Sequence, residues 1–237
     1  MPIERFLAAV PAEIRENWGR IPRLAYMGCH FSASGTGLSL LPKALPKGSL
    51  LLVDDRTPIQ GHDPELVARQ LREAVEALEC QGLLLDFQRP AMEDALTMVK
   101  ALTEALPCPT GVTSAYAQGL RCPVSLPPVP CHVPLSEYLT PWQGREIWLE
   151  VPTRGETITL TQKGSVTAPL TDHPRGPRFP EESLHCHYAI ALSENCARFS
   201  LWRTREDLAA LEREAEGYGV TQTLALWQEF RSFPGNT

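Results

Sequence analysis

The stretch Gly82-Leu-Leu-Leu-Asp-Phe-Gln-Arg-Pro90 decides how the rest of the chain is interpreted. Its run of leucines predicts a strand buried on both faces, which is typical of a parallel sheet. The polar side chains of Asp86, Gln88 and Arg89 follow directly. Asp86 and Gln88 are two residues apart, so on a strand they point to the same face. Because α/β proteins place their sites at the carboxyl ends of parallel strands, we expect a functional site here.

Strands and helices alternate in the first half of the chain. Leu24–His30 and Ser49–Val53 are predicted as buried strands, and a helix is predicted from Pro64, with Asp63 as its N-cap. The other elements expected in this half are a helix over Ile3–Trp18 broken near Pro11, the end of the Pro64 helix near Cys80, a strand at Leu83–Phe87, a helix at Met92–Leu106 and a strand at Thr110–Thr113. This alternation predicts a parallel sheet covered on both faces.

The second half is less regular and richer in proline. We expect strands at Pro123–Pro127, Arg145–Glu150, His187–Leu192 and Ala197–Trp202, a β-hairpin formed by Thr157–Thr161 and Ser165–Thr167, a loop at Asp172–Glu182, a helix from Thr204 to about Gly217, and either a strand at Thr223–Trp227 or a short helix through Phe230. The whole chain, residues 1–237, is predicted to form one α/β domain, a compact or degenerate (β/α) TIM-like barrel with a hairpin insertion at about 155–170. An open doubly wound sheet is the alternative.

Composition excludes several classes of function. The chain has 43% apolar residues, enough for a sizeable core, and a net charge of −6 with no basic run, so we expect no nucleic-acid partner. No apolar run approaches the roughly 20 residues that span a bilayer, and the N-terminus lacks a secretory signal pattern. Seven cysteines without a CxxC pair favour reduced thiols in a cytoplasm. No glycine-rich phosphate loop with Walker or dinucleotide spacing is present, and we expect no cofactor.

If the strands are parallel, their carboxyl ends converge on one face and gather polar side chains. The residues so collected are Cys29, His30, Asp54, Asp55, Arg56, Asp86, Gln88, Arg89, Tyr116, Glu150, Arg203 and Glu229. Simpler roles remain open for several of them. Asp54 and Asp55 also suit turns and caps, Arg89 suits an ion pair with Asp86 or Asp55, and Tyr116 suits a half-buried wall.

The segment Gln81–Gln88 resembles the strand-four signature of family 18 glycoside hydrolases, Asp-Gly-x-Asp-x-Asp-x-Glu. Gly82 matches the glycine, Asp86 matches the last aspartate, and Phe87 stands where an aromatic is usual. The resemblance implies that Asp86 orients the substrate acetamido group, whose carbonyl attacks the anomeric carbon. It also implies that Trp227 is a plausible floor of the sugar site.

The sequence departs from that signature where the proton donor belongs. Gln88 replaces the glutamate, while Gln81 and Leu84 replace the first and middle aspartates. Glutamine cannot donate a proton as a general acid, and loss of such an acid commonly slows a reaction about 10²–10⁴-fold.

Two carbohydrate hypotheses follow. The first is a carbohydrate-active barrel with an altered acid, in which Glu150 is an alternative to Gln88. The second is a non-catalytic protein, a possible pseudoenzyme, that binds a glycan or small ligand. The candidate catalytic residues are Asp86, Gln88 and Glu150, and the candidate substrate-binding residues are Asp54, Asp55, Arg89, Tyr116 and Trp227.

A metal-dependent hydrolase is a third, less favoured reading. His185-Cys-His187 would place two imidazoles on one face of a strand, and His30, His62 or Asp86 could add to them. The pair precedes the apolar run Tyr188–Leu192, however, and so lies at the start of a strand, on the face that serves stability in a barrel. We therefore assign no metal ligands.

Overall fold

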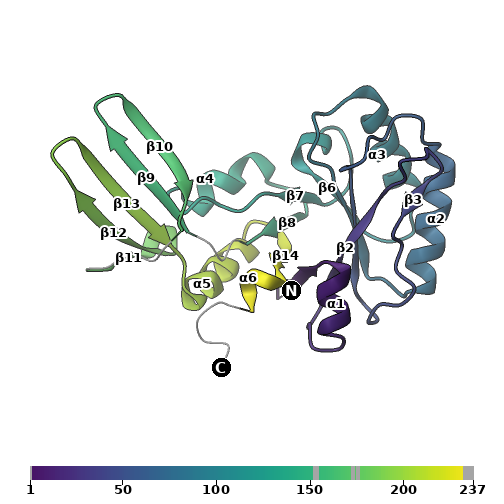
Figure 1. Cartoon of the computed structure of the whole chain (residues 1–237), viewed down its shortest axis with the longest axis horizontal. Helices are drawn as coiled ribbons and strands as arrows, with labels where there is room; N and C mark the ends of the chain where they lie inside the picture. Colours follow the sequence, from purple (N-terminus) through teal and green to yellow (C-terminus); the bar gives the residue numbers. More distant parts are fainter. Residues whose placement is uncertain (1, 152–154, 172–173, 175–176, 232–237) are drawn as a thin grey trace.

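The computed structural model describes residues 2–151, 155–171, 174 and 177–231. Eight parallel strands close into a barrel (Figure 1). In chain order they are β1 Glu4–Ala9, β2 Leu24–Phe31, β4 Leu50–Asp54, β5 Gly82–Asp86, β6 Thr110–Thr113, β7 Val124–Leu126, β8 Ile147–Glu150 and β14 Val220–Leu226. Because β1 pairs with β14 on one side and with β2 on the other, the sheet has no free edge in the barrel. The barrel prediction is therefore confirmed, and the open doubly wound alternative is wrong.

The helices around the barrel are unevenly distributed. They are α1 Pro11–Glu16, α2 Pro64–Ala77, α3 Glu93–Ala105, α4 Leu135–Leu139, α5 Arg205–Glu216 and α6 Trp227–Phe230, with 3₁₀ turns at Ser114–Tyr116, Thr140–Trp142 and Glu182–Leu184. After β2 the chain forms the two-residue strand β3 Leu38–Ser39, antiparallel to β2, where a complete barrel would have a helix. After β6 it makes only a 3₁₀ turn. The sheet of the barrel is thus complete, whereas the layer of helices around it is incomplete.

The helix predicted over Ile3–Trp18 is wrong, because its first half is the strand β1. Phe6 and Ala8 point into the barrel, and Leu7 and Ala9 pack on its outer side. A strand buried on both faces is a short continuous apolar run, which cannot be told from a buried helix by periodicity. The segment after Pro11 does form a helix, with proline at its first turn.

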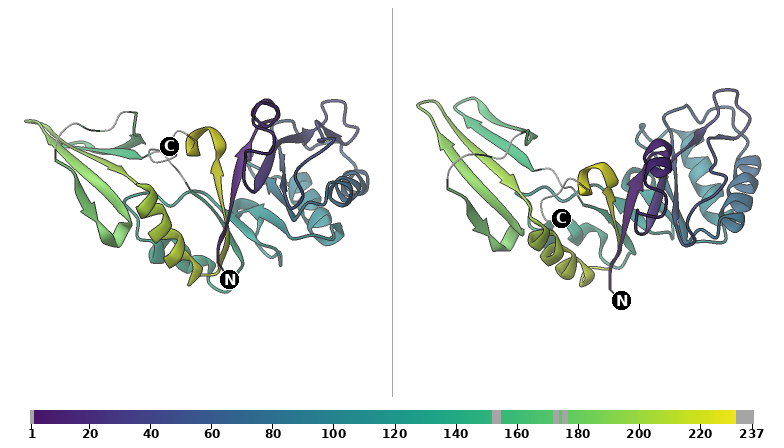
Figure 2. Two further views of the ribbon diagram at one scale, coloured as in Figure 1. Left: turned by 90° about the horizontal axis from the view of Figure 1, so that it is seen from below. Right: turned by 60° about the horizontal axis from the view of Figure 1, so that its bottom comes forward.

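A second, antiparallel sheet lies between β8 and α5 in the chain. Its strands are β9 Glu156–Thr161, β10 Gly164–Pro169, β11 Phe179–Glu181, β12 Cys186–Leu192 and β13 Cys196–Trp202, in the order β10-β9-β13-β12-β11. The expected hairpin is β9–β10, but it is part of this larger sheet because β13 pairs with β9. Figures 1 and 2 place the sheet at the opposite end of the molecule from α2 and α3, beside α4 and α5.

Two other expectations for the second half need correction. The loop expected at Asp172–Glu182 contains the strand β11 and the start of a 3₁₀ turn, while 172–173 and 175–176 lie outside the described residues. The strand β11 is held by its pairing with β12. It has only three residues, so its sequence is too short to show the alternation of apolar and polar residues that predicts a strand. At the C-terminal end, the strand and the helix offered as alternatives are both present, as β14 followed by α6.

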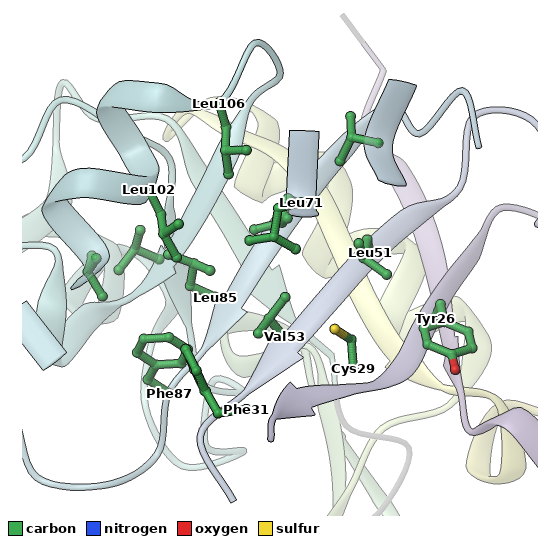
Figure 3. Packing of buried hydrophobic residues seen from close by; sticks show 14 of the residues in the cluster. Tyr26, Cys29, Phe31, Leu51, Val53, Leu71, Leu85, Phe87, Leu102 and Leu106 are labelled. Atoms are coloured by element: carbon green, nitrogen blue, oxygen red, sulfur yellow. The ribbon is translucent and has the colours of Figure 1, made fainter. Parts of the chain in front are cut away.

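The largest part of the core lies between the outer side of the barrel and helices α2 and α3. Figure 3 shows Leu51, Val53 and Leu85 from β4 and β5 meeting Leu71 of α2 and Leu102 of α3. All five side chains are fully buried. The helix α2 begins as predicted, since the Asp63 carboxylate accepts from the backbone N–H of Glu65 at 3.0 Å.

The inside of the barrel is filled around Trp148 of β8, which is completely buried. Its ring reaches glycines of two strands that do not pair with β8, Gly82 of β5 and Gly111 of β6. A Cβ atom on Gly111 would lie 2.4 Å from Trp148 Cε3, and one on Gly82 would lie 3.3 Å from its Cη2. Gly82, the glycine of the opening stretch, is tightly packed as well, because a Cβ atom there would also lie 3.0 Å from the Pro109 carbonyl oxygen and 3.1 Å from Leu50 Cδ2.

This packing predicts that Gly111→Ala destabilises the chain. The added methyl group cannot fit beside the indole, and overpacking of this kind costs about 1–3 kcal/mol of the free energy of unfolding, measurable by urea denaturation. The loss should shrink in a Trp148→Phe background, where the ring is smaller. As a control, Gly217→Ala at the helical end of α5 (φ −66°) should change stability by less than about 0.5 kcal/mol. A Gly111→Ala protein as stable as the unmodified chain would contradict this account of the barrel interior.

Candidate functional site

A cavity of about 600 Å³ lies at the carboxyl end of the barrel, between the barrel and the second sheet. Its floor is formed by apolar side chains of the barrel strands, among them Ala8, Met27, Leu52, Leu84 and Leu224. Its walls come from the loop Pro128–Cys131 and from the hairpin residues Gly155, Glu156 and Thr167–Pro169. Asp86, Glu150 and Glu229 complete the lining. The cavity is thus apolar at its base and carries carboxylates at its rim.

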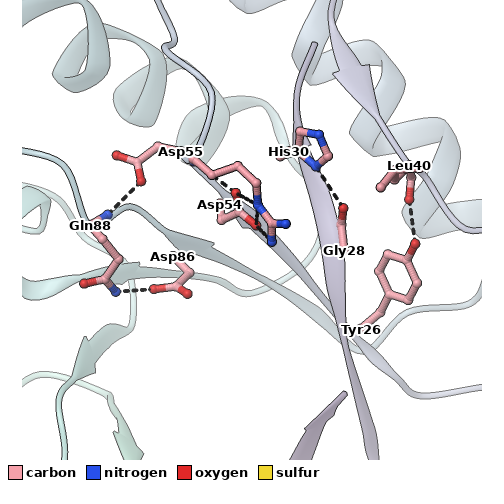
Figure 4. Close-up of polar contacts among 9 residues, drawn as sticks. Tyr26, Gly28, His30, Leu40, Asp54, Asp55, Asp86 and Gln88 are labelled. Carbon is pink, nitrogen blue, oxygen red and sulfur yellow. Dashed lines mark hydrogen bonds and ion pairs between the residues drawn. The ribbon is translucent and has the colours of Figure 1, made fainter. Parts of the chain in front are cut away.

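Asp86 is the last residue of β5, the fourth strand of the barrel, and it lines the cavity. Its carboxylate accepts a hydrogen bond of 2.5 Å from Gln88 Nε2 (Figure 4). Burial raises the pKa of Asp86; the bond from Gln88 opposes this rise, and the nearby carboxylates of Asp54 and Asp55 add to it. The amide at position 88 therefore acts on the aspartate that the sequence singled out.

Glu150, the last residue of β8, lines the same cavity. Burial raises the pKa of Glu150 to about 7, and the negative charge of Asp86 contributes further to the rise. A carboxyl group with a pKa near neutrality can both donate and accept a proton at physiological pH. The cavity thus contains one carboxyl group with the electrostatics of an acid or base catalyst, on a different strand from Gln88.

The other predicted residues around β5 fasten the loop that carries Gln88. Asp55, which is 3% exposed, accepts from the backbone N–H groups of Gln88 and Arg89 at 2.9 Å each. Tyr116 is completely buried, and its hydroxyl donates to the carbonyl oxygen of Arg89 at 2.8 Å. Arg89 donates to the carbonyl of Arg56 at 2.7 Å. These contacts position residue 88; direct contact of Asp55, Arg89 or Tyr116 with a substrate stays a prediction.

Asp54 lies beside Asp86 in the barrel, because the two residues are partners in the pairing of β4 with β5. The guanidinium of Arg56 neutralises Asp54, with Nε 2.7 Å from Oδ1 (Figure 4). Trp227 begins α6 and packs against the large outer core. It is not among the described residues that line the cavity, and its place as floor of a sugar site stays a prediction.

Three further residues of the predicted set lie away from the cavity lining. Cys29 is fully buried in the outer core, and burial raises its pKa to about 12. The ring of His30 donates from Nδ1 to the carbonyl of Gly28 at 3.1 Å (Figure 4). Arg203 is 4% exposed and donates to the carbonyls of Val129 and Pro130, so it supports one wall of the cavity from behind.

Glu156 is a cavity residue that the sequence did not indicate. It begins β9, and its carboxylate accepts from the backbone N–H of His132 at 3.1 Å and from His132 Nδ1 at 2.8 Å. This pair ties the second sheet to the loop that walls the cavity. No local signal marks Glu156, since its partner is 24 residues away in the chain.

The His185-Cys-His187 motif does not present two imidazoles on one strand face. His185 precedes β12 in a left-handed conformation (φ 46°), and only His187 belongs to the strand. Each ring contacts a carboxylate of α5: His185 Nε2 lies 2.6 Å from Glu214, and His187 Nδ1 lies 2.8 Å from Asp207. The described residues contain no group of three His, Cys, Asp or Glu side chains that could hold a metal ion.

No protein-family model and no curated protein matches this sequence. Solved structures do match its fold. The spore cortex-lytic enzyme SleL of Bacillus cereus is 12% identical with a TM-score of 0.59, over 99% of this chain and 72% of that one. A chitinase from Chromobacterium violaceum is 10% identical with a TM-score of 0.61, over 94% of this chain and 93% of that one.

A third match carries the family name. The GH18 chitinase from Cycas revoluta, solved with (GlcNAc)3, is 11% identical with a TM-score of 0.59, over 97% of this chain and 96% of that one. The resemblance to family 18 glycoside hydrolases is therefore confirmed at the level of the fold. The signature expected on the fourth strand does lie on the fourth barrel strand, because β1 is a strand and not a helix.

The loop contacts predict that Asp55→Asn lowers stability by about 1–3 kcal/mol, because the amide can accept from one of the two buried N–H groups and leaves the other without a partner. Differential scanning calorimetry would measure the change. Asp94→Asn on the exposed first turn of α3 is the matched control and should be nearly neutral. Equal melting temperatures for the two variants would show that Asp55 does not hold the loop.

The raised pKa of Glu150 predicts a pH-dependent stability. In the unfolded chain the group titrates near 4.5, and in the folded chain near 7. The folded state binds this proton more tightly, so the contribution to stability is complete below pH 4.5 and is lost as the pH rises through 7. Glu150→Gln should therefore gain roughly 2–3 kcal/mol relative to the unmodified chain between pH 5 and pH 8. A stability difference that is the same at both pH values would contradict the assignment.

Proposed function

We propose that this chain binds an oligosaccharide at the carboxyl end of its barrel, and that it does not hydrolyse it by the route of family 18 glycoside hydrolases. One observation carries the proposal: Gln88, in place of the family's acid, donates from its amide to Asp86 at the edge of the cavity. The loop around Gln88 is held by Asp55 and Tyr116, so the site is ordered for binding although its proton donor is missing.

The chemistry of the cavity suits a sugar. Its floor, with Leu52, Leu84 and Leu224, can pack against the apolar face of a pyranose ring, while carboxylates such as Asp86 and Glu150 accept hydrogen bonds from hydroxyl groups. A volume of about 600 Å³ is in the range of small-molecule sites. Support comes also from the tobacco class V chitinase, 11% identical with a TM-score of 0.60, which was solved with NAG4 while carrying a glutamate-to-glutamine mutation.

Hydrolysis with Glu150 as the acid is the second candidate function. The observation in its favour is the pKa of about 7 that burial and Asp86 give to Glu150. Such a group is half-protonated at neutral pH, which is the condition under which general acid catalysis is most effective. A bell-shaped pH–rate profile with one limb near pH 7, lost in Glu150→Gln, would favour this candidate over binding alone.

We also propose a cellular compartment for the protein. All seven cysteines are unpaired, which fits a reducing compartment such as the cytoplasm. No helix among the described residues is long and apolar enough to cross a membrane. The ligand we propose is therefore a short oligosaccharide available inside the cell, and the oligomeric state of the protein is left open.

Calorimetric titration with N-acetylated and deacetylated chito-oligosaccharides tests the proposal. We expect micromolar to millimolar binding without turnover of the unmodified chain, because the ordered site remains and the acid does not. Gln88→Glu should then create hydrolysis of the N-acetylated oligomer, by about 10²-fold or more over the unmodified chain. Glu76→Gln on the exposed face of α2 is the matched control and should create none. If neither kind of oligomer binds and Gln88→Glu stays inert, the proposed function is wrong.

A further inference from the structure

Two cavity carboxylates have no described cation beside them. The other acidic groups near the cavity are accounted for: Asp54 pairs with Arg56, Glu156 contacts His132, and Glu229 has an interaction of its own. Asp86 receives only the neutral amide of Gln88, and none of the described residues is a charged partner of Glu150. Two acids on different strands thus face one largely apolar cavity, and the described residues place no positive charge beside either of them.

One buried polar group inside the barrel has no partner among the described residues. Ser125, on β7 between β6 and β8, is 1% exposed, and its hydroxyl has no hydrogen-bond partner among the described residues. Its neighbours Val124 and Leu126 pack outward against α4 and α5. Because side chains alternate along a strand, Ser125 points into the barrel. It pairs in register with Trp148 and is not among the described residues that line the cavity. A buried hydroxyl without a partner is a site that a ligand or water would satisfy.

The two cavity carboxylates match the chemistry of a primary ammonium. It carries one positive charge and three N–H donors, and it accepts no hydrogen bond. The carboxylate oxygens of Asp86 and Glu150 can each accept one of those donors, and hydrogen bonds between charged partners are about twice as strong as neutral ones. A neutral acetamido group offers one N–H donor and no charge, so it forms no ion pair with either acid.

We propose that the sugar bound in this cavity is an amino sugar with a free, positively charged ammonium group, held between Asp86 and Glu150. The inference rests on the proposed function, because it assumes that an oligosaccharide occupies the site. It names the class of sugar: a deacetylated glucosamine oligomer, in contrast to the N-acetylated oligomers with which the structurally similar chitinases were solved.

Binding of this cation is linked to loss of a proton. Near pH 6 the Glu150 carboxyl of the free protein is largely protonated, since its pKa is about 7. An ammonium group beside it favours the carboxylate and lowers that pKa. Binding therefore releases the Glu150 proton to the buffer, and the ion pair forms between the Glu150 carboxylate and the ammonium group of the sugar. Affinity for the amino sugar should rise as the pH increases from 5 to 6, and it should fall again where the amine itself loses its proton.

The experiment is isothermal titration of the full chain with the glucosamine tetramer and the N-acetylglucosamine tetramer at pH 6. Each titration is run in two buffers of different ionisation enthalpy, which reveals protons released on binding. We expect the glucosamine tetramer to bind about tenfold or more tightly than the N-acetylated one, with a net release of protons. The N-acetylated tetramer should release none.

Variants separate this inference from the proposed function. Glu150→Gln should abolish the proton release and reduce the preference for the glucosamine tetramer about tenfold. Glu137→Gln on the exposed side of α4 is the control and should change neither. Equal or tighter binding of the N-acetylated tetramer, or binding without proton release, overturns the inference and leaves the proposed function standing. If neither tetramer binds, the proposed function itself fails.

Discussion

Closure of the barrel depends on the pairing of β1 with two partners, β14 from the end of the chain and β2 from its beginning. This pairing removes the free edges of the parallel sheet and brings all eight carboxyl ends into one ring. Asp86 and Glu150 can line one cavity only because the sheet closes in this way. The second sheet then covers one side of that ring and contributes Glu156 and the hairpin residues to the cavity wall.

The site holds residue 88 in a fixed position, and the side chain at that position is an amide. Around residue 88 the loop is held from two neighbouring strands, by Asp55 after β4 and by Tyr116 after β6. Such preorganisation is typical of a position whose side chain must point in one direction. The side chain found there is an amide, which can donate to Asp86 but cannot transfer a proton. Glu150, on another strand, is the carboxyl group in the cavity whose pKa burial raises to about 7.

Local sequence patterns were sufficient to predict an element where it is amphipathic or where capping and turn residues mark its ends. Helix α2 begins at Pro64 after its Asp63 cap as predicted, and the strand from Gly82 ends in the polar residues that line or border the cavity. They were insufficient for β1, since its apolar part, Phe6–Ala9, is too short to distinguish a buried strand from a buried helix. They were also insufficient for Asp55 and Tyr116, whose partners are backbone groups about 30 residues away in the chain.

By itself the sequence determined the alternation of buried strands and helices, the polar cluster after Gly82–Asp86 and the amide at position 88, because each is a matter of neighbouring residues. Only the tertiary structure decided that β1 closes the barrel, that Trp148 requires glycine at position 111, and that Asp86 and Glu150 share one cavity. These features depend on which strands become neighbours in space. The packing of the whole barrel determines which strands pair, and this pairing cannot be predicted from a short stretch of sequence.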